Sequence, residues 1–384
     1  MKVEQVMLSL IGEVVLGHQM ESLDDVVWEE LLPSLYKLSG IHDMSHIIAE
    51  ALDRRGLLNG EYGIKFQKRR MLAVFRYQQL QYELDSVAEA FEQAKIPFMP
   101  LKGSVLRAAY PEGWMRTSCD IDILVRREDL DAAIDLLVQT RQYRMEKSGL
   151  CDVSLYAPSE VHLELHHDLV LESRARDAAK LLSRVWEYSA PVAPGSYRYA
   201  MCDEVFYLYH IAHMAKHFEI GGSGVRPILD LWIMDAAADQ DRTERRNALL
   251  REAKLMAFTD GARRLSRVWF EGAEHDDITS DMNDYVLRSG IYGCIENRVA
   301  AGQVKTGGKI QYIFSRLFLP LERMRVYYPT LQRHAWLLPF YYVKRALRLL
   351  SKGRAKRSLA ELRRIPNDPL TQAKRLLSRL ELIK

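Results

Sequence analysis

Asp120 and Asp122 stand one residue apart in an otherwise apolar, largely β-branched run, Asp-Ile-Asp-Ile-Leu-Val, at residues 120–125. Side chains alternate between the two faces of a strand, so we expect both carboxylates on one face and Ile121 and Ile123 on the other, in a core. Neighbouring carboxylates repel each other unless a cation lies between them. Oxygen ligands of this kind suit Mg²⁺, which commonly handles phosphates. The motif predicts a divalent-cation site; a pair of exposed strand acids is the alternative.

A second strand pattern supplies a third carboxylate. Residues 161–166 read Val-His-Leu-Glu-Leu-His, so Glu164 is expected to share a strand face with His162 and His166. If this strand lies beside the first, Glu164 becomes a third metal ligand and a candidate general base for an acceptor hydroxyl. A solvent-facing glutamate is one alternative. A zinc site is another, but no further ligand spacing supports it, and we interpret His166 as a support for the carboxylates or a packed core residue.

Gly103 and Ser104 precede the acidic pair, and fifteen residues separate Ser104 from Asp120. Backbone N–H groups and a hydroxyl at a strand-to-helix junction can bind phosphates, although a Gly-Ser turn is also a common helix cap. Lys102 either contacts a triphosphate or is simply exposed. Arg116 braces the carboxylates, reaches a phosphate or forms a surface salt bridge.

This order of features resembles the nucleotidyltransferase superfamily that includes DNA polymerase beta. More narrowly, Lys102-Gly103, Arg116, the Asp120–Val125 strand and Glu164-Leu165-His166 are similar to a bacterial family of uncharacterised nucleotidyltransferases. The motif-bearing part spans residues 95–168. The interval before the aspartates is longer than in many members, and Glu164 stands where aspartate is common, which changes the expected metal geometry.

The resemblance implies Mg²⁺ or Mn²⁺ on Asp120, Asp122 and Glu164, with the phosphates of an NTP over Gly103 and Ser104. A weaker likeness continues through a histidine-rich helix, which it places opposite the carboxylates. The implied triphosphate or acceptor ligands there are His213, Lys216, Arg226 and Asp230. Structural packing is an alternative, as is a zinc site formed by the helix-spaced histidines His210, His213 and His217.

Composition and charge narrow the class of protein. The 384 residues are 48% hydrophobic and 27% charged, as in ordinary globular proteins of two or three domains. The four cysteines form no Cys-x-x-Cys pair, so we expect no zinc ribbon, no disulfide framework and a cytoplasmic location. We expect no export signal, and no uninterrupted apolar run reaches the roughly 20 residues that span a bilayer.

The charge is unevenly distributed. The whole chain carries +3, but residues 305–384 hold 19 Lys and Arg against 4 Asp and Glu, a local net charge of +15. This region could bind RNA, an anionic membrane surface or an acidic partner; a solvated helical face docked on the acidic body is the alternative.

The periodicity predicts an α+β chain with a small mixed β-sheet and flanking helices. Strands are expected near residues 98–101, 121–125, 153–156 and 161–166, with helices before and after them. Four parts follow: an N-terminal helical region (1–92), a nucleotidyltransferase core (93–172), a helical domain closing the cleft (173–301) and a basic C-terminal helical region (302–384).

These features favour a metal-dependent enzyme that moves an NMP from an NTP to an acceptor hydroxyl or phosphate and releases pyrophosphate. The acceptor stays open among small molecules, proteins and RNA. A non-catalytic nucleotide-binding scaffold with a basic tail and a nucleotide-adding toxin acting on tRNA are the competing hypotheses. The sequence has no P-loop, no dinucleotide fingerprint after a strand and no kinase catalytic motifs.

Overall fold

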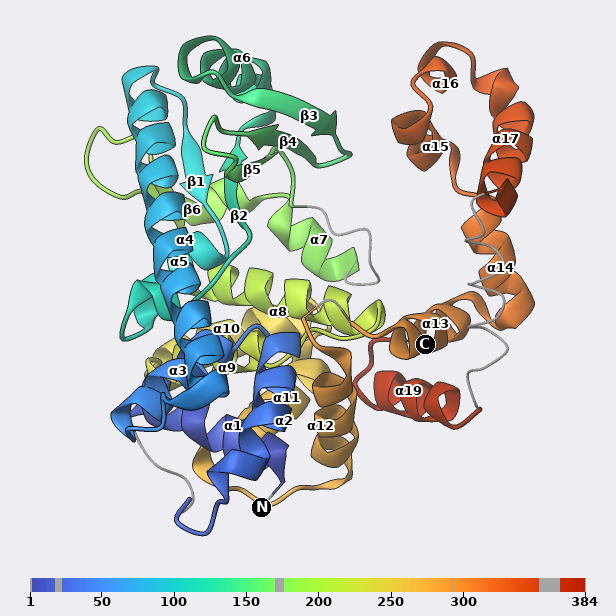
Figure 1. Cartoon of the computed structure of the whole chain (residues 1–384). Coiled ribbons are helices and arrows are strands. Elements are labelled where there is room, and N and C mark those ends of the chain that lie inside the picture. Colours follow the sequence, from blue (N-terminus) through green and yellow to red (C-terminus); the bar gives the residue numbers. More distant parts are fainter. Residues whose placement is uncertain (1, 18–22, 170–175, 292, 352–366, 384) are drawn as a thin grey trace.

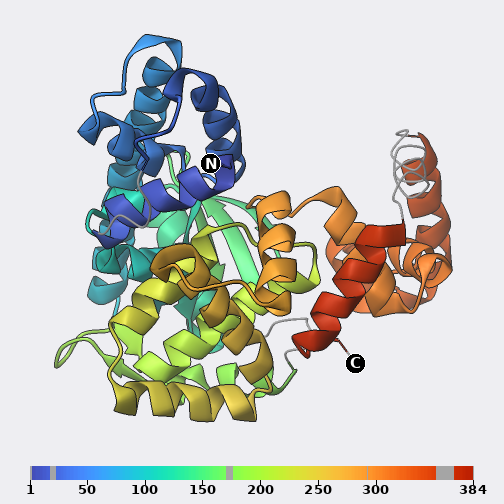
Figure 2. The same cartoon turned by 90° about the horizontal axis from the view of Figure 1, so that it is seen from below.

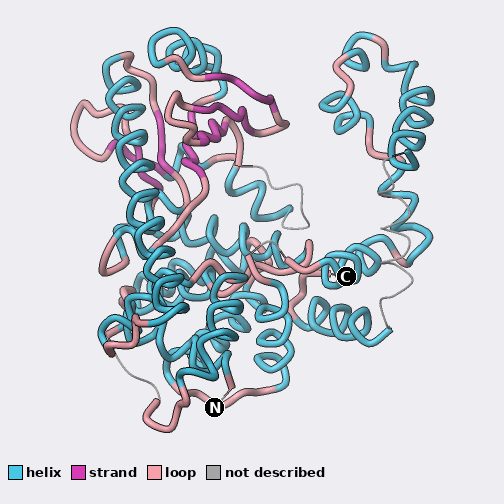
Figure 3. The backbone as a smooth tube through the Cα atoms, in the orientation of Figure 1, coloured by secondary structure: helices cyan, strands magenta, loops and turns pink. Residues whose placement is uncertain are grey.

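The computed structural model describes residues 2–17, 23–169, 176–291, 293–351 and 367–383. Helices dominate it, and a small sheet lies at one end of the molecule (Figures 1 and 3). The fold is α+β, as predicted. Within the described residues no helix combines the length and the apolar composition needed to cross a membrane.

The described residues before the sheet form the α-helices α1 (Val3–Ile11), α2 (Trp28–Ile41), α3 (Ser45–Arg54) and α4 (Gly60–Gln93). The 34-residue α4 joins two hydrophobic cores: Phe66 lies in the larger, helical core, and Leu80, Leu84, Val87 and Phe91 pack under the sheet. Glycine is required near its start, because a Cβ on Gly63 would lie 2.4 Å from the Leu58 backbone.

The five-stranded sheet has the order β1-β2-β5-β4-β3. Its strands are β1 (Phe98–Pro100), β2 (Asp120–Val125), β3 (Arg144–Ser148), β4 (Asp152–Tyr156) and β5 (His162–His166). The β2 and β5 strands are parallel, and the other pairs are antiparallel. Helices α4 and α6 (Leu130–Arg141) cover the apolar face through a core that includes Ile121, Ile123, Leu163 and Leu165. The opposite face carries the acidic residues.

Between β1 and β2 the chain forms α5 (Gly103–Leu106) and two short 3₁₀ turns (Arg107–Ala109 and Gly113–Met115). After the sheet come α7 (Arg176–Leu182), the hairpin of β6 (Ser189–Pro191) and β7 (Tyr199–Met201), and helices α8 (Asp203–Glu219), α9 (Arg226–Ala236), α10 (Gln240–Glu252), α11 (Met256–Glu271) and α12 (Asp277–Ser289).

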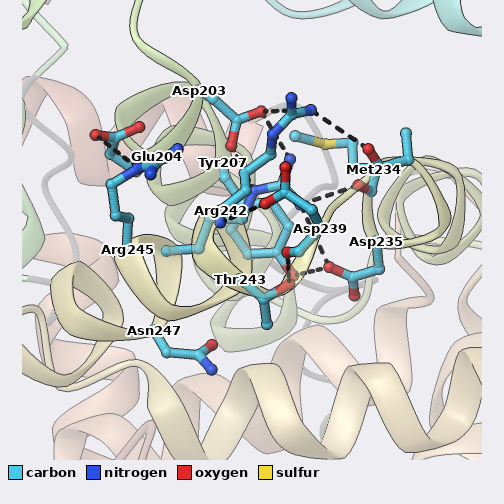
Figure 4. A network of polar contacts seen from close by, with 12 residues as sticks. Asp203, Glu204, Tyr207, Met234, Asp235, Asp239, Arg242, Thr243, Arg245 and Asn247 are labelled. Carbon is cyan, nitrogen blue, oxygen red and sulfur yellow. Dashed lines mark hydrogen bonds and ion pairs between the residues drawn. The ribbon is translucent and has the colours of Figure 1, made fainter.

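A polar network fixes α8, α9 and α10 relative to one another (Figure 4). Arg246 of α10 is 2% exposed and donates two hydrogen bonds to Asp203 of α8, at 2.6 and 2.7 Å, and one to the Met234 carbonyl of α9. Arg263 of α11 joins the network through Asp235. A buried guanidinium satisfied on several elements holds them in a specific arrangement, because a displaced helix would leave charges unpaired.

The chain ends in α13 (Ile295–Thr306), α14 (Lys309–Leu317), α15 (Leu321–Tyr327), α16 (Thr330–Arg333), α17 (Leu338–Ser351) and α19 (Asn367–Arg379). Helices α14 to α17 project from the body, whereas α19 returns and lies against α13 (Figures 1 and 2). Ala373, Leu376, Leu377 and Leu380 anchor α19 in the large core.

Three details of the predicted elements are wrong. The edge strand β3 and the β6–β7 hairpin were not expected. The sequence pattern predicts a helix over residues 243–256, but α10 begins at Gln240, because the Asp239 carboxylate caps it by accepting a 2.7 Å bond from the Arg242 N–H. It ends at Glu252 rather than at Met256, since Lys254 adopts a left-handed φ of 56°.

Candidate active site

The parallel pairing of β2 and β5 brings the three carboxylates together. Asp120 lies opposite His162 and Asp122 opposite Glu164, so alternation places all four side chains on the polar face of the sheet. Ligand atoms of Asp120, His162 and Glu164 lie within 4.8 Å of one another, as do those of Asp122, Glu164 and His166. The two groups share Glu164, so its carboxylate lies close to both aspartates.

Two cationic side chains neutralise the most buried carboxylate. Asp122 is 4% exposed, and its Oδ1 accepts bonds of 2.7 Å from the Lys102 ammonium and 2.7 Å from His166 Nε2. Burial opposes the ionised form, but Lys102 and His166 outweigh it and lower the pKa of Asp122. Although burial lowers the pKa of His166, hydrogen bonds to Asp122 and Glu164 raise it to about 9. Asp122 is therefore held as an anion.

Asp120 is under the opposite influence. Its burial, together with the charges of Asp122 and Glu164, raises the pKa of Asp120 to about 6. This is the repulsion expected when carboxylates crowd together without enough positive charge. A divalent cation would relieve it, and carboxylate oxygens are suitable ligands. The donor set therefore fits a divalent metal ion.

Lys102 reaches Asp122 from a strained backbone conformation. Its φ of 45° and ψ of −119° are uncommon for a residue with a Cβ. The bond from the Leu101 N–H to the Asp122 carbonyl, 2.9 Å, fixes the preceding residue on β2. Gly103 is closely packed, since a Cβ there would lie 3.2 Å from Ser118 Cβ. The Ser104 N–H already donates to the Leu101 carbonyl, so its half-buried hydroxyl is the group left for a ligand.

Helices α8 and α9 form the other side of the site. A cavity of about 170 Å³ is lined by Lys102, Arg116, Tyr209, His210, His213, His217, Ser223, Arg226, Asp230 and several apolar residues. Tyr209 and His213 lie near enough to Lys102 and Asp122 for those charges to influence their pKa values. The predicted residues His213, Arg226 and Asp230 therefore share one cavity with Lys102. Lys216 does not line this cavity.

The cavity histidines are neutral. Nε2 of His213 and Nε2 of His217 lie 3.3 Å apart, so one ring can donate a hydrogen bond to the other. Burial lowers the pKa of both, to about 4 for His217, and the nearby ammonium groups of Lys102 and Lys216 lower it further. Among the described residues no group of metal-binding side chains includes the histidines of α8.

Asp230 links α9 to the segment before β2. It is fully buried, and its Oδ1 accepts 2.7 Å bonds from Arg116 Nε and from the Tyr110 hydroxyl. Burial raises the pKa of Asp230, but the charge of Arg116 outweighs it, so the net shift is downward. Arg226 pairs with Asp43. Arg116 and Asp230 thus hold the two walls of the cavity together.

Three buried polar atoms of the cavity lining have no hydrogen-bond partner in the part of the chain that the structure describes: Ser223 Oγ, Arg226 Nε and Asp230 Oδ2. Buried polar atoms are normally satisfied, so these atoms are open to a ligand that offers both donors and acceptors. Sequence reasoning missed Ser223 and Tyr209. Tyr209 could have been found, because it precedes His213 by one helical turn and so shares its face.

The comparison with known families agrees with this geometry. A family model described as "Uncharacterised nucleotidyltransferase" matches residues 28–271, from α2 to the end of α11. No curated protein matches the chain. The matched residues include the carboxylates of the sheet and the facing helices, and they make up more than half of the sequence. The chain therefore belongs to this family of uncharacterised nucleotidyltransferases.

Proposed function

We propose that this protein transfers an NMP from an NTP to an acceptor oxygen with release of pyrophosphate. The observation that carries the proposal is that Asp120 and Asp122 of β2 each lie in a compact group of ligand atoms with the same residue of β5, Glu164. Family membership supports the general class of reaction. Mg²⁺ or Mn²⁺ held by the three carboxylates would neutralise charge on the triphosphate and on the leaving pyrophosphate.

The protein side chains position the reactants and move one proton. The acceptor oxygen attacks the α-phosphorus, a new P–O bond forms, and the bond to pyrophosphate breaks. Glu164 is our candidate for the base that takes the acceptor proton, since its side chain is 28% exposed and can be reached. Lys102 and the Ser104 hydroxyl, with Gly103 allowing close approach, would contact the phosphates.

On the opposite wall, His213, Arg226 and Asp230 would orient the triphosphate or the acceptor, and Arg116 would keep Asp230 in place. Lys216 would contribute positive charge from outside the cavity lining. We also propose the four-part division at residues 92, 172 and 301, a cytoplasmic location and an anionic partner for the basic C-terminal region. The acceptor is a small molecule, a protein or an RNA.

Asp120→Asn is the decisive variant. It removes a metal ligand while keeping the shape of the side chain, so we expect nucleotide transfer to fall roughly a thousandfold. Because it also relieves the repulsion between carboxylates, the folding stability of the metal-free protein should be unchanged or higher. Asp122→Asn should also abolish transfer, but it leaves the Lys102 ammonium without its partner and should cost about 3 kcal/mol of stability. Incubation with each α-labelled NTP, Mg²⁺ or Mn²⁺ and a cell extract measures transfer.

The matched control is Asp131→Asn, which changes an exposed carboxylate on α6, beyond the apolar face of the sheet. It should transfer label at the normal rate. Normal turnover in purified Asp120→Asn, or an equal loss in the control, would refute the assignment. Binding of an NTP without pyrophosphate release in the presence of extract would indicate the scaffold hypothesis instead.

A further inference from the structure

A second hollow, distinct from the cavity between α8 and α9, lies between α4 and residues 116–119. It is a groove of about 400 Å³ whose lining includes four arginines: Arg69, Arg76, Arg107 and Arg116. One acidic residue, Asp43, also lines it, but its carboxylate already binds Arg226 and the Thr117 hydroxyl. Arg116 is paired with Asp230, so the positive charge without an acidic partner among the described residues comes from Arg69, Arg76 and Arg107.

Arg107 is the most unusual member of this set. It is 5% exposed, with Nε bonded to the Gly103 carbonyl at 3.1 Å and Nη2 bonded to Ser118 Oγ at 3.0 Å. Its Nη1 is buried without a partner, and within the described part of the chain it forms no ion pair. Burial lowers the pKa of Arg107, the ring of Tyr77 opposes this, and Arg116 adds to it. Burying a guanidinium without a counter-ion is costly.

Arg69 and Arg76 add exposed positive charge at the same place. Arg69 Nε donates to the Tyr36 hydroxyl at 3.3 Å, and Arg76 Nη2 to the Cys119 carbonyl at 3.1 Å. Neither has an acidic partner among the described residues. Arg70, their neighbour on α4, instead pairs with Glu50 and Asp53. On α4, therefore, Arg70 forms ion pairs, whereas the arginines that line the groove form none with the residues that the structure describes.

The groove also offers apolar contact. Leu72 and Phe75 line it and are 51% and 63% exposed. Arginines beside an exposed aromatic ring suit a phosphate that carries a flat group, because the guanidinium groups bind the oxyanion while the ring stacks. The groove extends along residues 116–119 as far as Cys119, and none of the three carboxylates of the sheet lines it.

We propose that this arginine groove binds the phosphate group of a phosphate ester whose organic part packs against Phe75. The shared chemistry covers a free nucleoside monophosphate and the phosphate of a polynucleotide. The proposal does not depend on nucleotide transfer and needs no metal ion.

The test measures binding to the full chain by titration calorimetry with EDTA present, so that the carboxylate cluster cannot hold a cation. The probes are AMP and a 5′-phosphorylated single-stranded oligonucleotide. We expect Arg69→Gln/Arg76→Gln to weaken the tighter-binding probe at least about tenfold, because two charge-assisted contacts are lost. Lys37→Gln/Lys68→Gln removes the same charge from exposed positions on α2 and α4 outside the groove and should change affinity less than twofold.

Each outcome decides the proposal. If AMP binds more tightly, the ligand is a small molecule; if the oligonucleotide binds more tightly, the ligand is a polynucleotide. Either result supports the proposed phosphate site if the arginine double variant weakens binding and the lysine double variant does not. Absence of binding by both probes, or equal weakening in the two double variants, would overturn it. Arg107→Met should abolish binding. Because Arg107 is buried, this variant can fail to fold, and in that case the result for Arg69→Gln/Arg76→Gln decides the proposal. Asp120→Asn should bind normally, which separates this result from the test of transfer.

Discussion

His42 and His46 are buried side chains at the N-terminal end of α3. Nε2 of His42 lies 3.1 Å from the Leu287 carbonyl, and Nε2 of His46 lies 2.9 Å from the Met115 carbonyl. A carbonyl accepts, so each Nε2 carries the proton. Burial lowers the pKa of each histidine to about 4, with only partial compensation by these bonds. Both are therefore neutral in the folded protein near pH 7.

Acid should destabilise the protein before any carboxylate of ordinary pKa is protonated. Between pH 6.5 and pH 4 the unfolded chain binds protons at His42 and His46 that the folded chain does not. The stabilisation is complete above pH 6.5 and is lost as the pH falls, by at most about 1.4 kcal/mol per pH unit for each histidine. Urea unfolding followed by circular dichroism at several pH values measures this slope.

His46→Gln tests the contribution of one ring. The glutamine amide can still donate to the Met115 carbonyl but cannot titrate, so the slope should fall by up to about 1.4 kcal/mol per pH unit. His275→Gln, at an exposed position, is the control and should retain the wild-type slope. An unchanged slope in His46→Gln would show that this histidine does not sense acid.

The turn from α8 to α9 depends on glycine. Residues 221–224 read Gly-Gly-Ser-Gly and connect the two helices that line the cavity, with Ser223 in its wall. Gly222 has a φ of +117°, and a Cβ there would lie 1.9 Å from Ser289 Oγ. The Ser289 side chain is held in place, because its hydroxyl donates a hydrogen bond to the Gly221 carbonyl and accepts one from the Asn297 amide. The loop therefore fixes α9 by close packing against α12.

Gly222→Ala should cost at least about 3 kcal/mol of folding free energy, because steric overlap adds to backbone strain. Gly195→Ala is the matched control, since its φ of +81° is also unfavourable for alanine but nothing lies within 4 Å. It should cost only about 1 kcal/mol. Urea denaturation gives both values, and equal costs would show that the contact with Ser289 is unimportant.

The elements that build the site were predictable where alternation was strong. In β2 and β5 nearly every second residue is a buried Ile, Leu or Val, so the polar face could be assigned from sequence. The edge strand β3 reads Arg-Met-Glu-Lys-Ser and has no such alternation, and β6 and β7 are only three residues each. Their pairing is decided by tertiary contacts, which local patterns do not encode.

In the site, too, local sequence patterns predict some features, and others depend on tertiary contacts. Adjacent placement of Asp122 and Glu164 was an assumption from sequence, since two parallel strands separated by 36 intervening residues need not be neighbours; the sheet order supports it. The unpaired state of Arg107 was not predictable, because its burial depends on α4 crossing the segment before β2. Periodicity identifies faces of elements, but the counter-charges that each side chain meets depend on the assembled fold.

The charge of the chain is divided unevenly along the sequence, and its basic C-terminal part includes the projecting helices α14 to α17. Residues 1–304 carry a net charge of −12 and residues 305–384 one of +15. Along α17, Phe340, Val343 and Leu347 recur at helical spacing and are 60–62% exposed, and Trp336 just before the helix is 76% exposed. Basic side chains, including Lys344, Arg345 and Arg348, lie among them. A surface with exposed apolar side chains beside positive charge is typical of helices that lie on anionic lipid.

We expect the full chain to sediment with vesicles of phosphatidylglycerol and phosphatidylcholine but not with phosphatidylcholine alone, and increasing salt should weaken this binding. Phe340→Ser/Leu347→Ser should reduce partitioning at least about tenfold, because two large apolar side chains no longer enter the interface. Phe75→Ser/Leu72→Ser, which removes exposed apolar side chains from α4, should bind vesicles normally. If the α17 variant sediments with vesicles as the unmodified chain does, or if the chain binds tRNA but no vesicles, α17 does not bind lipid and the basic region has a different partner.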